Sequence, residues 1–262
     1  MTRFTVDAGG VALSARVDGD EGKPWLLLSN SLAADLTMWD DQIGLLTRTH
    51  RVLRYDTRGH GQSGAPVGPY SFDYLVADMV ALLDHVGAAR ADVMGLSLGG
   101  MTALGLGLTH PGRVGRMVVC DARADAPPPF VQSWDDRIAT IRASGMAAVV
   151  EGTLARWFTP AADPSVPERA RAMILATSPI GYEGCAGALK RLDYLRHLGR
   201  MTVPVHYIVG AEDMGAPPAA MRAMAEATPG ASFAEIPGTA HVPNMENPAA
   251  FAAALGDFLG AA

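Results

Sequence analysis

One serine stands in a setting that suits nucleophilic chemistry. Gly95-Leu96-Ser97-Leu98-Gly99 follows a short apolar run typical of a strand and precedes a run with helical spacing. A Gly-x-Ser-x-Gly turn between a strand and a helix holds its serine in a strained conformation with the hydroxyl exposed, and its glycines leave room for chain that passes close by. The helix that follows directs free N–H groups toward negative charge developing beside the serine. We therefore predict that Ser97 is a catalytic nucleophile.

A serine hydroxyl is a weak nucleophile until a base removes its proton, so the chemistry needs a histidine on another loop. His241 fits best, because it lies within Pro237–Pro248, directly after a strand-like run and before the final helical run. The other six histidines lie in or beside predicted strands and helices or in a glycine turn, where a structural role is favoured. His241 is therefore the predicted base.

A carboxylate must orient this histidine and stabilise its protonated form. In the chain order serine, acid, histidine, the acid follows the strand predicted at Val205 to Val209, where Gly210-Ala211-Glu212-Asp213 offers two carboxylates. We favour Asp213, which ends a Gly-x-x-Asp turn, over Glu212, which we expect to face solvent. Asp121 directly follows an earlier predicted strand and stays open as an alternative acid.

Two backbone N–H groups should point at the carbonyl oxygen of a substrate as that oxygen gains charge. One belongs to the residue after the nucleophile, Leu98, and the other to the loop after the third strand, where position indicates Leu32. A second polar turn, Asp56-Thr57-Arg58-Gly59-His60-Gly61, follows the next strand. We expect its Asp56 and Arg58 to form a structural ion pair.

The elements that must position these residues alternate along the chain. Short apolar runs bounded by Gly, Pro, Asn or Asp alternate with longer runs of helical spacing, which is typical of βαβ units on a mostly parallel sheet. Eight strands are predicted, at Arg3 to Ala8, Val11 to Val17, Trp25 to Ser29, Val52 to Tyr55, Ala91 to Leu96, Val114 to Cys120, Val205 to Val209 and Ser232 to Ile236. Helices are predicted at Trp39 to Leu46, Phe72 to His85, Ser97 to Thr109, Pro217 to Ala227 and Pro248 to Phe258. The fold class is therefore α/β, with an eight-stranded, mostly parallel sheet flanked by helices.

The stretch from Arg123 to Met201 breaks this alternation. It is too long for a crossover between strands and has no convincing strand of its own. Helical patterns occur around Val131 to Ile141, Ala147 to Phe158, Pro167 to Ala176 and Tyr182 to Leu198. We interpret residues 123–201 as an inserted helical cap over the carboxyl edge of the sheet, where open α/β folds bind ligands. Residues 1–122 and 202–262 then form the core.

Composition and charge argue against several classes of function. The 262 residues suffice for one large core, and the net charge of −6 gives little reason to expect nucleic acid or an anionic membrane as a partner. No run approaches the roughly 20 apolar residues of a membrane span, and the start lacks the apolar segment of a signal peptide, so we expect a cytoplasmic protein. Cys120 and Cys185 lack metal-ligand spacing and no phosphate loop occurs, so neither a metal nor another cofactor is predicted.

With these motifs the chain resembles the α/β-hydrolase fold superfamily over essentially its whole length. Within that superfamily it is most similar to the 3-oxoadipate enol-lactonases. The similarity lies in Leu28 to Leu32, Met38-Trp39-Asp40, Arg51 to Gly61, Gly68-Pro69-Tyr70 and Gly95 to Met101. Two departures lie near the expected pocket. Ala33 stands where these lactonases commonly have glycine, and Cys120-Asp121-Ala122-Arg123 replaces an Ala-Asn-Thr-like sequence.

The resemblance implies a serine hydrolase that cleaves a small carboxylic ester or lactone through an acyl-enzyme, most specifically 3-oxoadipate enol-lactone in the catabolism of aromatic compounds. Ser97 would attack the lactone carbonyl, and the ring would open with an enolate leaving group. Such a substrate carries a carboxylate, so an arginine should face the pocket. The candidates are Arg123, Arg137 and Arg156. Apolar walls of the pocket are expected from Trp39, Met101, Trp134, Trp157 and Val242.

Other functions are compatible with the same motifs. The triad also suits a general carboxylesterase, a carbon–carbon hydrolase of ring-cleavage products or a perhydrolase. A serine nucleophile argues against epoxide hydrolases and haloalkane dehalogenases, which need a carboxylate at that position. A non-catalytic ligand-binding protein on the same fold belongs to another class, because fold alone does not establish function. The full set of Ser97, Asp213 and His241 argues against that class.

Overall fold

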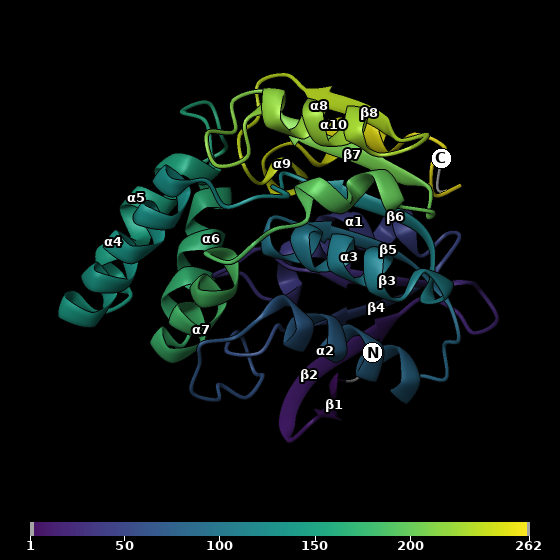
Figure 1. The fold of residues 1–262 in the computed structure, drawn as a ribbon, viewed down its shortest axis with the longest axis horizontal. Coiled ribbons are helices and arrows are strands. Elements are labelled where there is room, and N and C mark those ends of the chain that lie inside the picture. The colour runs from purple at the N-terminus through teal and green to yellow at the C-terminus, as the bar shows by residue number, and fades with distance from the viewer. Residues whose placement is uncertain (1–2, 261–262) are drawn as a thin grey trace.

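One sheet of eight strands runs through the centre of the protein in a computed structural model that describes residues 3–260 (Figure 1). The order across the sheet is β1-β2-β4-β3-β5-β6-β7-β8. The pairs β1–β2 and β2–β4 are antiparallel, and the other pairs are parallel. The bounds are β1 Arg3–Ala8, β2 Val11–Asp18, β3 Trp25–Ser29, β4 Arg51–Tyr55, β5 Ala91–Leu96, β6 Val114–Cys120, β7 Val205–Gly210 and β8 Ser232–Ile236. Residues 1, 2, 261 and 262, the ends of the predicted core, lie outside the described residues.

The central strands are apolar runs because helices cover them on both faces. Every residue of β7 is buried, and β3, β5 and β6 are buried over most of their length. Strands covered on both faces need near-continuous apolar sequence, whereas the edge strand β1 mixes buried and exposed residues. The prediction of an α/β fold with an eight-stranded, mostly parallel sheet is confirmed.

Helices pack on the two faces of this sheet. On one face α2 (Phe72–His85) contacts α3 (Leu98–Thr109), and α8 (Pro218–Ala227) packs on β7; on the other, α1 (Asp40–Leu46) contacts α10 (Pro248–Leu255) (Figure 1). The shorter helices are η1 Leu36–Trp39, η2 Pro111–Arg113, η3 Leu195–Arg200 and α9 Pro243–Glu246. The last helix is shorter than predicted, because Gly256 with a φ of 48° ends it at Leu255. Within residues 3–260, no helix combines the length and the apolar character that crossing a membrane requires.

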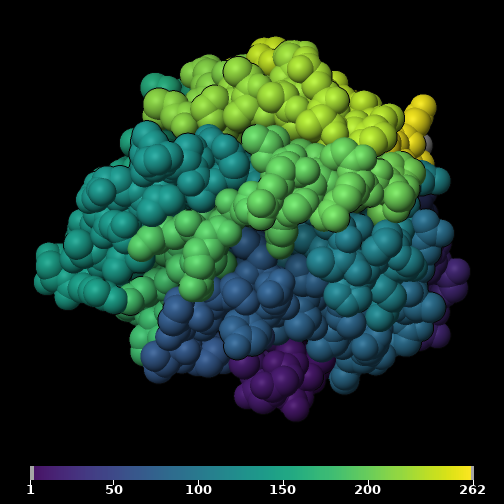
Figure 2. Space-filling view, viewed as in Figure 1, coloured from purple at the N-terminus to yellow at the C-terminus, as the bar shows by residue number. Residues whose placement is uncertain are grey.

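The four α-helices between β6 and β7 form a lobe beside the sheet, coloured teal to green in Figures 1 and 2. Their bounds are α4 Pro128–Ser144, α5 Ala147–Trp157, α6 Ser165–Ala176 and α7 Pro179–Leu189. The lobe and the sheet domain approach each other closely at two glycines. A Cβ on Gly59 would lie 2.2 Å from the Cα of Gly181, so a side chain at Gly59 would collide with α7.

The final helix of this lobe is shorter than the sequence pattern suggests. A single helix was expected over Tyr182 to Leu198, but α7 ends at Leu189. The chain then leaves the helical path because the N–H groups of Tyr194 and Leu195 both donate to the carbonyl oxygen of Ala124, at 2.7 and 2.8 Å. These long-range hydrogen bonds join the two ends of the inserted segment. They cannot be predicted from local helical spacing.

The polar turn after β4 is held differently from our expectation. Arg58 forms two hydrogen bonds to Asp78 of α2, at 2.6 and 2.7 Å, so the expected ion pair between Asp56 and Arg58 is wrong. Asp56 instead accepts the N–H of Leu36 at 2.8 Å. The two side chains therefore tie one turn to two different elements, α2 and η1.

Candidate active site

Ser97 occupies the sharp turn between β5 and α3. Its φ of 55° lies in the left-handed region, which a residue other than glycine adopts only where the surrounding structure holds it. A Cβ on Gly95 would lie 2.2 Å from the carbonyl oxygen of Gly99, and a Cβ on Gly99 would lie 2.2 Å from that of Ser29. The turn therefore requires glycine at both positions, which is the physical basis of the sequence motif.

His241 approaches Ser97 from the loop between β8 and α9. Its Nε2 lies 3.0 Å from the Oγ of Ser97, and its Nδ1 lies 2.7 Å from Oδ2 of Asp213. Glu246 fixes this loop, because its carboxylate accepts one N–H within the loop and the N–H of Thr159 from the helical lobe, each at 2.7 Å. The structure thus brings the three residues singled out in the sequence into one hydrogen-bonded triad.

Asp213 is held as a carboxylate. Its Oδ1 accepts the N–H groups of Gly215, at 2.7 Å, and Ala216, at 3.1 Å. Burial raises the pKa of Asp213, but the charge and hydrogen bond of His241 together with these two N–H groups bring the pKa below its ordinary value. An ionised Asp213 can orient the imidazole and stabilise it after it takes a proton. The geometry therefore favours Asp213 over Asp121, whose hydrogen bond goes to a backbone N–H.

Two backbone N–H groups are available beside Ser97 for a developing oxyanion. Leu98 is the first residue of α3, so no preceding helical turn accepts its N–H, and Leu32 lines the same cavity as Ser97. The loop that carries Leu32 is pinned, because the N–H of Ala33 donates to Nε2 of His60 at 2.9 Å. Burial lowers the pKa of His60 to about 4, which keeps its ring neutral and able to accept this bond. The arrangement can therefore support the predicted oxyanion hole.

A cavity of about 360 Å³ opens over Ser97 and His241. Loops at the carboxyl ends of the strands form one side of it, and α4, α5 and α7 form the other, so it has the size and place of a small-molecule site. Met101, Trp134 and Trp157 line the cavity, in agreement with the sequence analysis. Other lining side chains include Phe130, Thr153, Tyr182, Leu189 and Met214.

The structure does not place Trp39 and Val242 in the wall of this cavity, which corrects two expectations. Both residues are fully buried. Nε1 of Trp39 donates to Oδ1 of Asn30 at 3.0 Å, and its ring packs against Phe251. The N–H of Val242 faces the carbonyl oxygen of Trp157 at 3.3 Å. The Trp39 side chain therefore supports the loop of Asn30 from within the core, and the backbone of Val242 ties the His241 loop to the end of α5.

All three candidate arginines line the cavity, but their partners differ. Arg123 pairs with Asp125 at 3.1 Å. Arg137 lies over the ring of Trp134, 4.3 Å from its centre, and within residues 3–260 neither Arg137 nor Arg156 forms an ion pair with a carboxylate. Burial and then the nearby charge of Arg137 lower the pKa of Arg156 to about 10, so it stays charged at neutral pH. The cavity thus holds two cations that have no carboxylate partner among the described residues.

One group of side chains at the site has the composition of a metal site. Asp121, Asp213 and His241 place one ligand-type atom each within 4.8 Å of one another. A cation there would compete with the hydrogen bond between Asp213 and His241 and leave Ser97 without its base. The donor set therefore fits the triad better than it fits a metal ion.

Comparison with known proteins agrees with this geometry. Residues 24–248 match the alpha/beta hydrolase fold family. The chain belongs to that family. This alpha/beta hydrolase is 34% identical over 250 residues to 3-oxoadipate enol-lactonase 2 of Acinetobacter baylyi, an alignment that covers 94% of this chain and 92% of the relative.

Solved structures give the same picture over nearly the whole alpha/beta hydrolase. An enol-lactonase from Burkholderia xenovorans LB400 is 37% identical, with a TM-score of 0.93 and coverage of 97% of this chain and 99% of that one. A hydrolase from Pseudomonas aeruginosa PA01 is 39% identical, with a TM-score of 0.93 and coverage of 98% of each chain. The predicted resemblance and the prediction of an ester or lactone hydrolase are confirmed.

Some residues of the hydrolase's cavity cannot be predicted from the sequence, because their place depends on tertiary contacts. Tyr182 and Phe130 line the cavity, but helical spacing alone does not show which face of a cap helix meets the core. Their aromatic character, on the helices next to the candidate arginines, was the available signal. His60 was expected to be structural, and its bond to Ala33 gives it a place directly behind the oxyanion loop.

Proposed function

We propose that this hydrolase cleaves a small lactone that carries a carboxylate, and that 3-oxoadipate enol-lactone, an intermediate of aromatic-compound catabolism, is its substrate. The observation that carries the proposal is the Ser97–His241–Asp213 triad beneath a cavity that also holds two cations to which no carboxylate of residues 3–260 is paired. The names of the enol-lactonase relatives support the same substrate. Residues 123–201 act in this proposal as a cap that contributes the substrate-binding arginines.

The proposed reaction begins with acylation of Ser97. His241 removes the proton of the Ser97 hydroxyl through Nε2, and Oγ forms a bond to the lactone carbonyl carbon. The N–H groups of Leu32 and Leu98 stabilise the oxygen that becomes negative. The ring C–O bond then breaks, and the enolate that leaves takes the proton that His241 received from Ser97 and becomes a ketone, which makes ring opening effectively irreversible and returns His241 to its neutral form.

Hydrolysis of the acyl-enzyme completes the proposed cycle. His241 removes a proton from a water molecule, the water oxygen forms a bond to the acyl carbon, and the bond from that carbon to Oγ of Ser97 breaks. The proton on His241 returns to Ser97, and the acid leaves. Asp213 stabilises the imidazolium in both halves of the cycle, as its hydrogen bond to Nδ1 permits.

The substrate carboxylate is proposed to bind on the cap side of the cavity, between Arg137 and Arg156. Arg156 is partly buried, and a cation in that setting gains when an anion enters beside it. The side chain of Trp134 under Arg137 holds that guanidinium at the cavity wall. A neutral ester lacks this interaction, so the arrangement discriminates between substrates by charge.

A comparison of substrates with the purified protein tests the proposal. The panel holds 3-oxoadipate enol-lactone, an enol-lactone of the same ring with a methyl group in place of the carboxymethyl group, an aryl acetate and a vinylogous diketone. We expect the charged lactone to have the highest kcat/KM, about 10–100-fold above its neutral counterpart, as a charge-assisted hydrogen bond allows. The proposal fails if the charged lactone is the poorest substrate, and a superior diketone would indicate a carbon–carbon hydrolase.

Variants of the arginines sharpen this test. Arg137→Gln and Arg156→Gln should raise KM for the charged lactone about 10-fold each and leave the neutral lactone nearly unchanged. Arg142→Gln is the matched control, since Arg142 lies on the same helix as Arg137 but pairs with Glu183 at the surface. Equal effects on both lactones would contradict an anion site.

We also propose that the protein acts in the cytoplasm on a small molecule, without nucleic acid or membrane as a partner. Two buried cysteines, Cys120 and Cys185, are unpaired, which fits a reducing compartment. A non-catalytic binding protein on this fold is the contrasting hypothesis. It would be favoured if a serine-directed phosphonate failed to label Ser97 and aryl acetate was not hydrolysed.

A further inference from the structure

Asp121 is a buried carboxyl group at the site that the proposed reaction does not use. It follows β6 directly and is fully buried. Its Oδ1 accepts the N–H of Gly210 at 2.8 Å, whereas its Oδ2 is buried without a hydrogen-bond donor. A buried polar atom without a partner costs free energy, so it requires an explanation.

The explanation lies in the neighbour of Asp121. The ligand-type atoms of Asp121, Asp213 and His241 lie within 4.8 Å of one another, so the carboxyl groups of Asp121 and Asp213 are neighbours inside the protein. Two adjacent buried carboxyl groups cannot both ionise at low cost, so one of them keeps its proton. Asp213 accepts hydrogen bonds from two N–H groups and from His241, whereas Asp121 accepts one. The proton therefore belongs on Asp121.

We propose that Asp121 is a positioning residue whose neutral carboxyl group donates a hydrogen bond from Oδ2 to Asp213, and so holds the carboxylate that orients His241. The proposal rests on the proposed function of the triad and deepens it. Asp121 then acts through Asp213. Oδ2 of Asp121, which otherwise lacks a partner, becomes a hydroxyl whose acceptor is the Asp213 carboxylate. The neutral acid takes no proton from His241 during the reaction.

The surroundings of Asp121 agree with a neutral carboxyl group. The titratable groups near it are Asp213 on the loop after β7, His241 on the loop after β8, Glu246 on α9 and the adjacent thiol of Cys120. Burial and then the charge of Asp213 raise the pKa of Asp121 well above its ordinary value, with a further contribution from Glu246, and the N–H of Gly210 opposes them only in part.

The backbone at Asp121 is also held in an unusual conformation. Its φ is 46°, in the left-handed region, and its N–H donates to the carbonyl oxygen of Ile208 at 2.9 Å. Asp and Asn are the side chains that most often adopt this region, and glycine adopts it freely. Asp121→Asn therefore keeps the backbone and supplies an amide N–H as donor, while Asp121→Gly keeps the backbone and deletes the donor.

The test follows the pKa of His241 in the wild-type protein and in these two variants. The pKa is measured by NMR of the imidazole without substrate and from the acid limb of the pH profile of kcat/KM for an aryl acetate. We expect Asp121→Asn to leave the His241 pKa unchanged, because one neutral donor replaces another. Asp121→Gly should raise it, because an Asp213 that has lost its donor stabilises the imidazolium more strongly, and should lower kcat about 10-fold with KM unchanged.

Two outcomes would overturn the proposal. A clear fall in the His241 pKa in Asp121→Asn would mean that the replacement removed a negative charge, so that Asp121 is ionised. An unchanged pKa and kcat in Asp121→Gly, with only the melting temperature altered, would mean that the residue is purely structural. The NMR arm needs no turnover, so a protein that hydrolysed none of the substrates would refute the proposed function and leave this test intact.

Discussion

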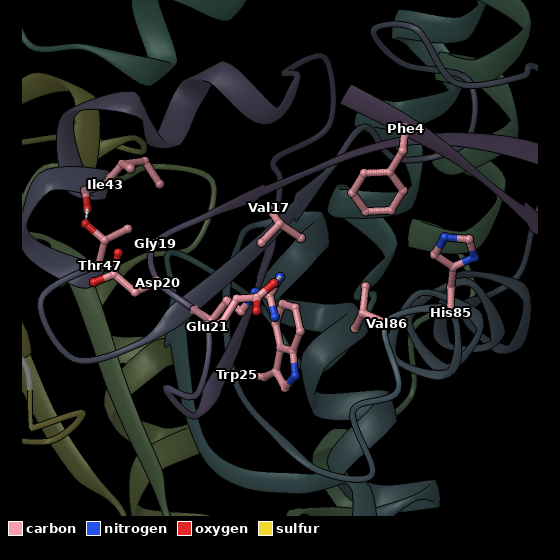
Figure 3. Close-up of a pocket in the computed structure, with 11 residues that line it drawn as sticks. Phe4, Val17, Gly19, Asp20, Glu21, Trp25, Ile43, Thr47, His85 and Val86 are labelled. Carbon is pink, nitrogen blue, oxygen red and sulfur yellow. Dashed lines mark hydrogen bonds and ion pairs between the residues drawn. The ribbon is translucent and has the colours of Figure 1, made fainter. Parts of the chain in front are cut away.

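Two hollows of the protein differ in size and in chemistry, and the larger one does not hold the triad. A wide hollow of about 790 Å³ lies at the amino ends of β3 and β4, and Figure 3 shows Trp25 and His85 on its walls. The cavity over Ser97 measures about 360 Å³ and lies at the carboxyl ends of the strands. The two also differ in how their polar groups are arranged.

Arg51 and His85 of the wide hollow contact other side chains of its walls. Arg51 pairs with Glu21 at 3.4 Å and lies over the ring of Trp25, 4.8 Å from its centre. The ring of His85 stacks on that of Phe4, with centres 5.4 Å apart. By contrast, Ser97, its base His241 and two arginines that have no carboxylate partner within residues 3–260 line the other cavity. Convergence of a nucleophile, its base and cations that lack carboxylate partners therefore marks a site better than volume does.

Removal of a hydroxyl should give the largest difference in kcat between variants of the two hollows. Ser97→Ala should lower kcat for an aryl acetate by about 10⁶-fold, because it removes the hydroxyl that is hydrogen-bonded to the base His241. Thr47→Ala removes a hydroxyl from the wide hollow and should leave kcat within about twofold, as expected for a surface change. Steady-state kinetics of both variants checks the pair. Substantial turnover by Ser97→Ala would contradict the assignment of Ser97 as the nucleophile.

Replacement of a carboxylate should give the next largest difference in kcat between variants of the two hollows. Asp213→Asn should lower kcat by about 10⁴-fold, because an amide favours the wrong tautomer of His241 and no longer stabilises the imidazolium. Asp20→Asn in the wide hollow is the matched change and should have no effect. An Asp213→Asn variant that is as active as the wild type would refute this assignment and return Asp121 to consideration as the acid.

A substitution behind the loop that carries Leu32 and Ala33 should lower kcat by a smaller factor. His60→Gln should weaken the support that the His60 ring gives to Ala33 and so lower kcat by about 10–100-fold, less than or equal to the loss of a direct oxyanion donor. His85→Gln in the wide hollow serves as the control histidine. We expect KM to change little in either variant. A His60→Gln protein with wild-type kcat would show that the loop needs no such support.

The same histidine should make stability depend on pH. His60 has a pKa of about 4 in the folded protein against 6.5 in the unfolded chain, so the unfolded state binds more protons between these values and stability rises with pH. The wild-type free energy of unfolding should therefore fall as the pH drops from 6.5 to 4, by up to about 3 kcal/mol. Urea titrations across this range should show a shallower fall in His60→Gln than in His85→Gln. Identical slopes would contradict a buried neutral His60.

The comparison also shows what sequence alone can predict. The turn at Ser97 is a local device, since Gly95 and Gly99 are dictated by contacts within the strand-turn-helix unit and its neighbour strand. The strands were predicted nearly to the residue for a similar reason, because burial on both faces demands apolar runs that are visible in the sequence.

Features that depend on contacts between distant elements could not be predicted. Trp39 has the same residue type as Trp134, but its indole N–H is taken by Asn30 and its ring lies in the core. Arg58 pairs with Asp78, and nothing in its own turn indicates a partner on α2. The choice between Asp213 and Asp121 likewise required the position of His241. Residue type and spacing therefore gave the chemistry, and tertiary contacts decided its partners.

The central claim is that Ser97 forms a covalent acyl intermediate with a carboxylate-bearing lactone. Its most direct test is mass spectrometry of the protein quenched within one turnover of 3-oxoadipate enol-lactone. Ring opening leaves both parts of a lactone on one molecule, so the account predicts an increase equal to the whole mass of the substrate, located on the peptide that contains Ser97 and absent in Ser97→Ala. Turnover of the lactone with no adduct on Ser97, or with an adduct on another residue, would contradict it.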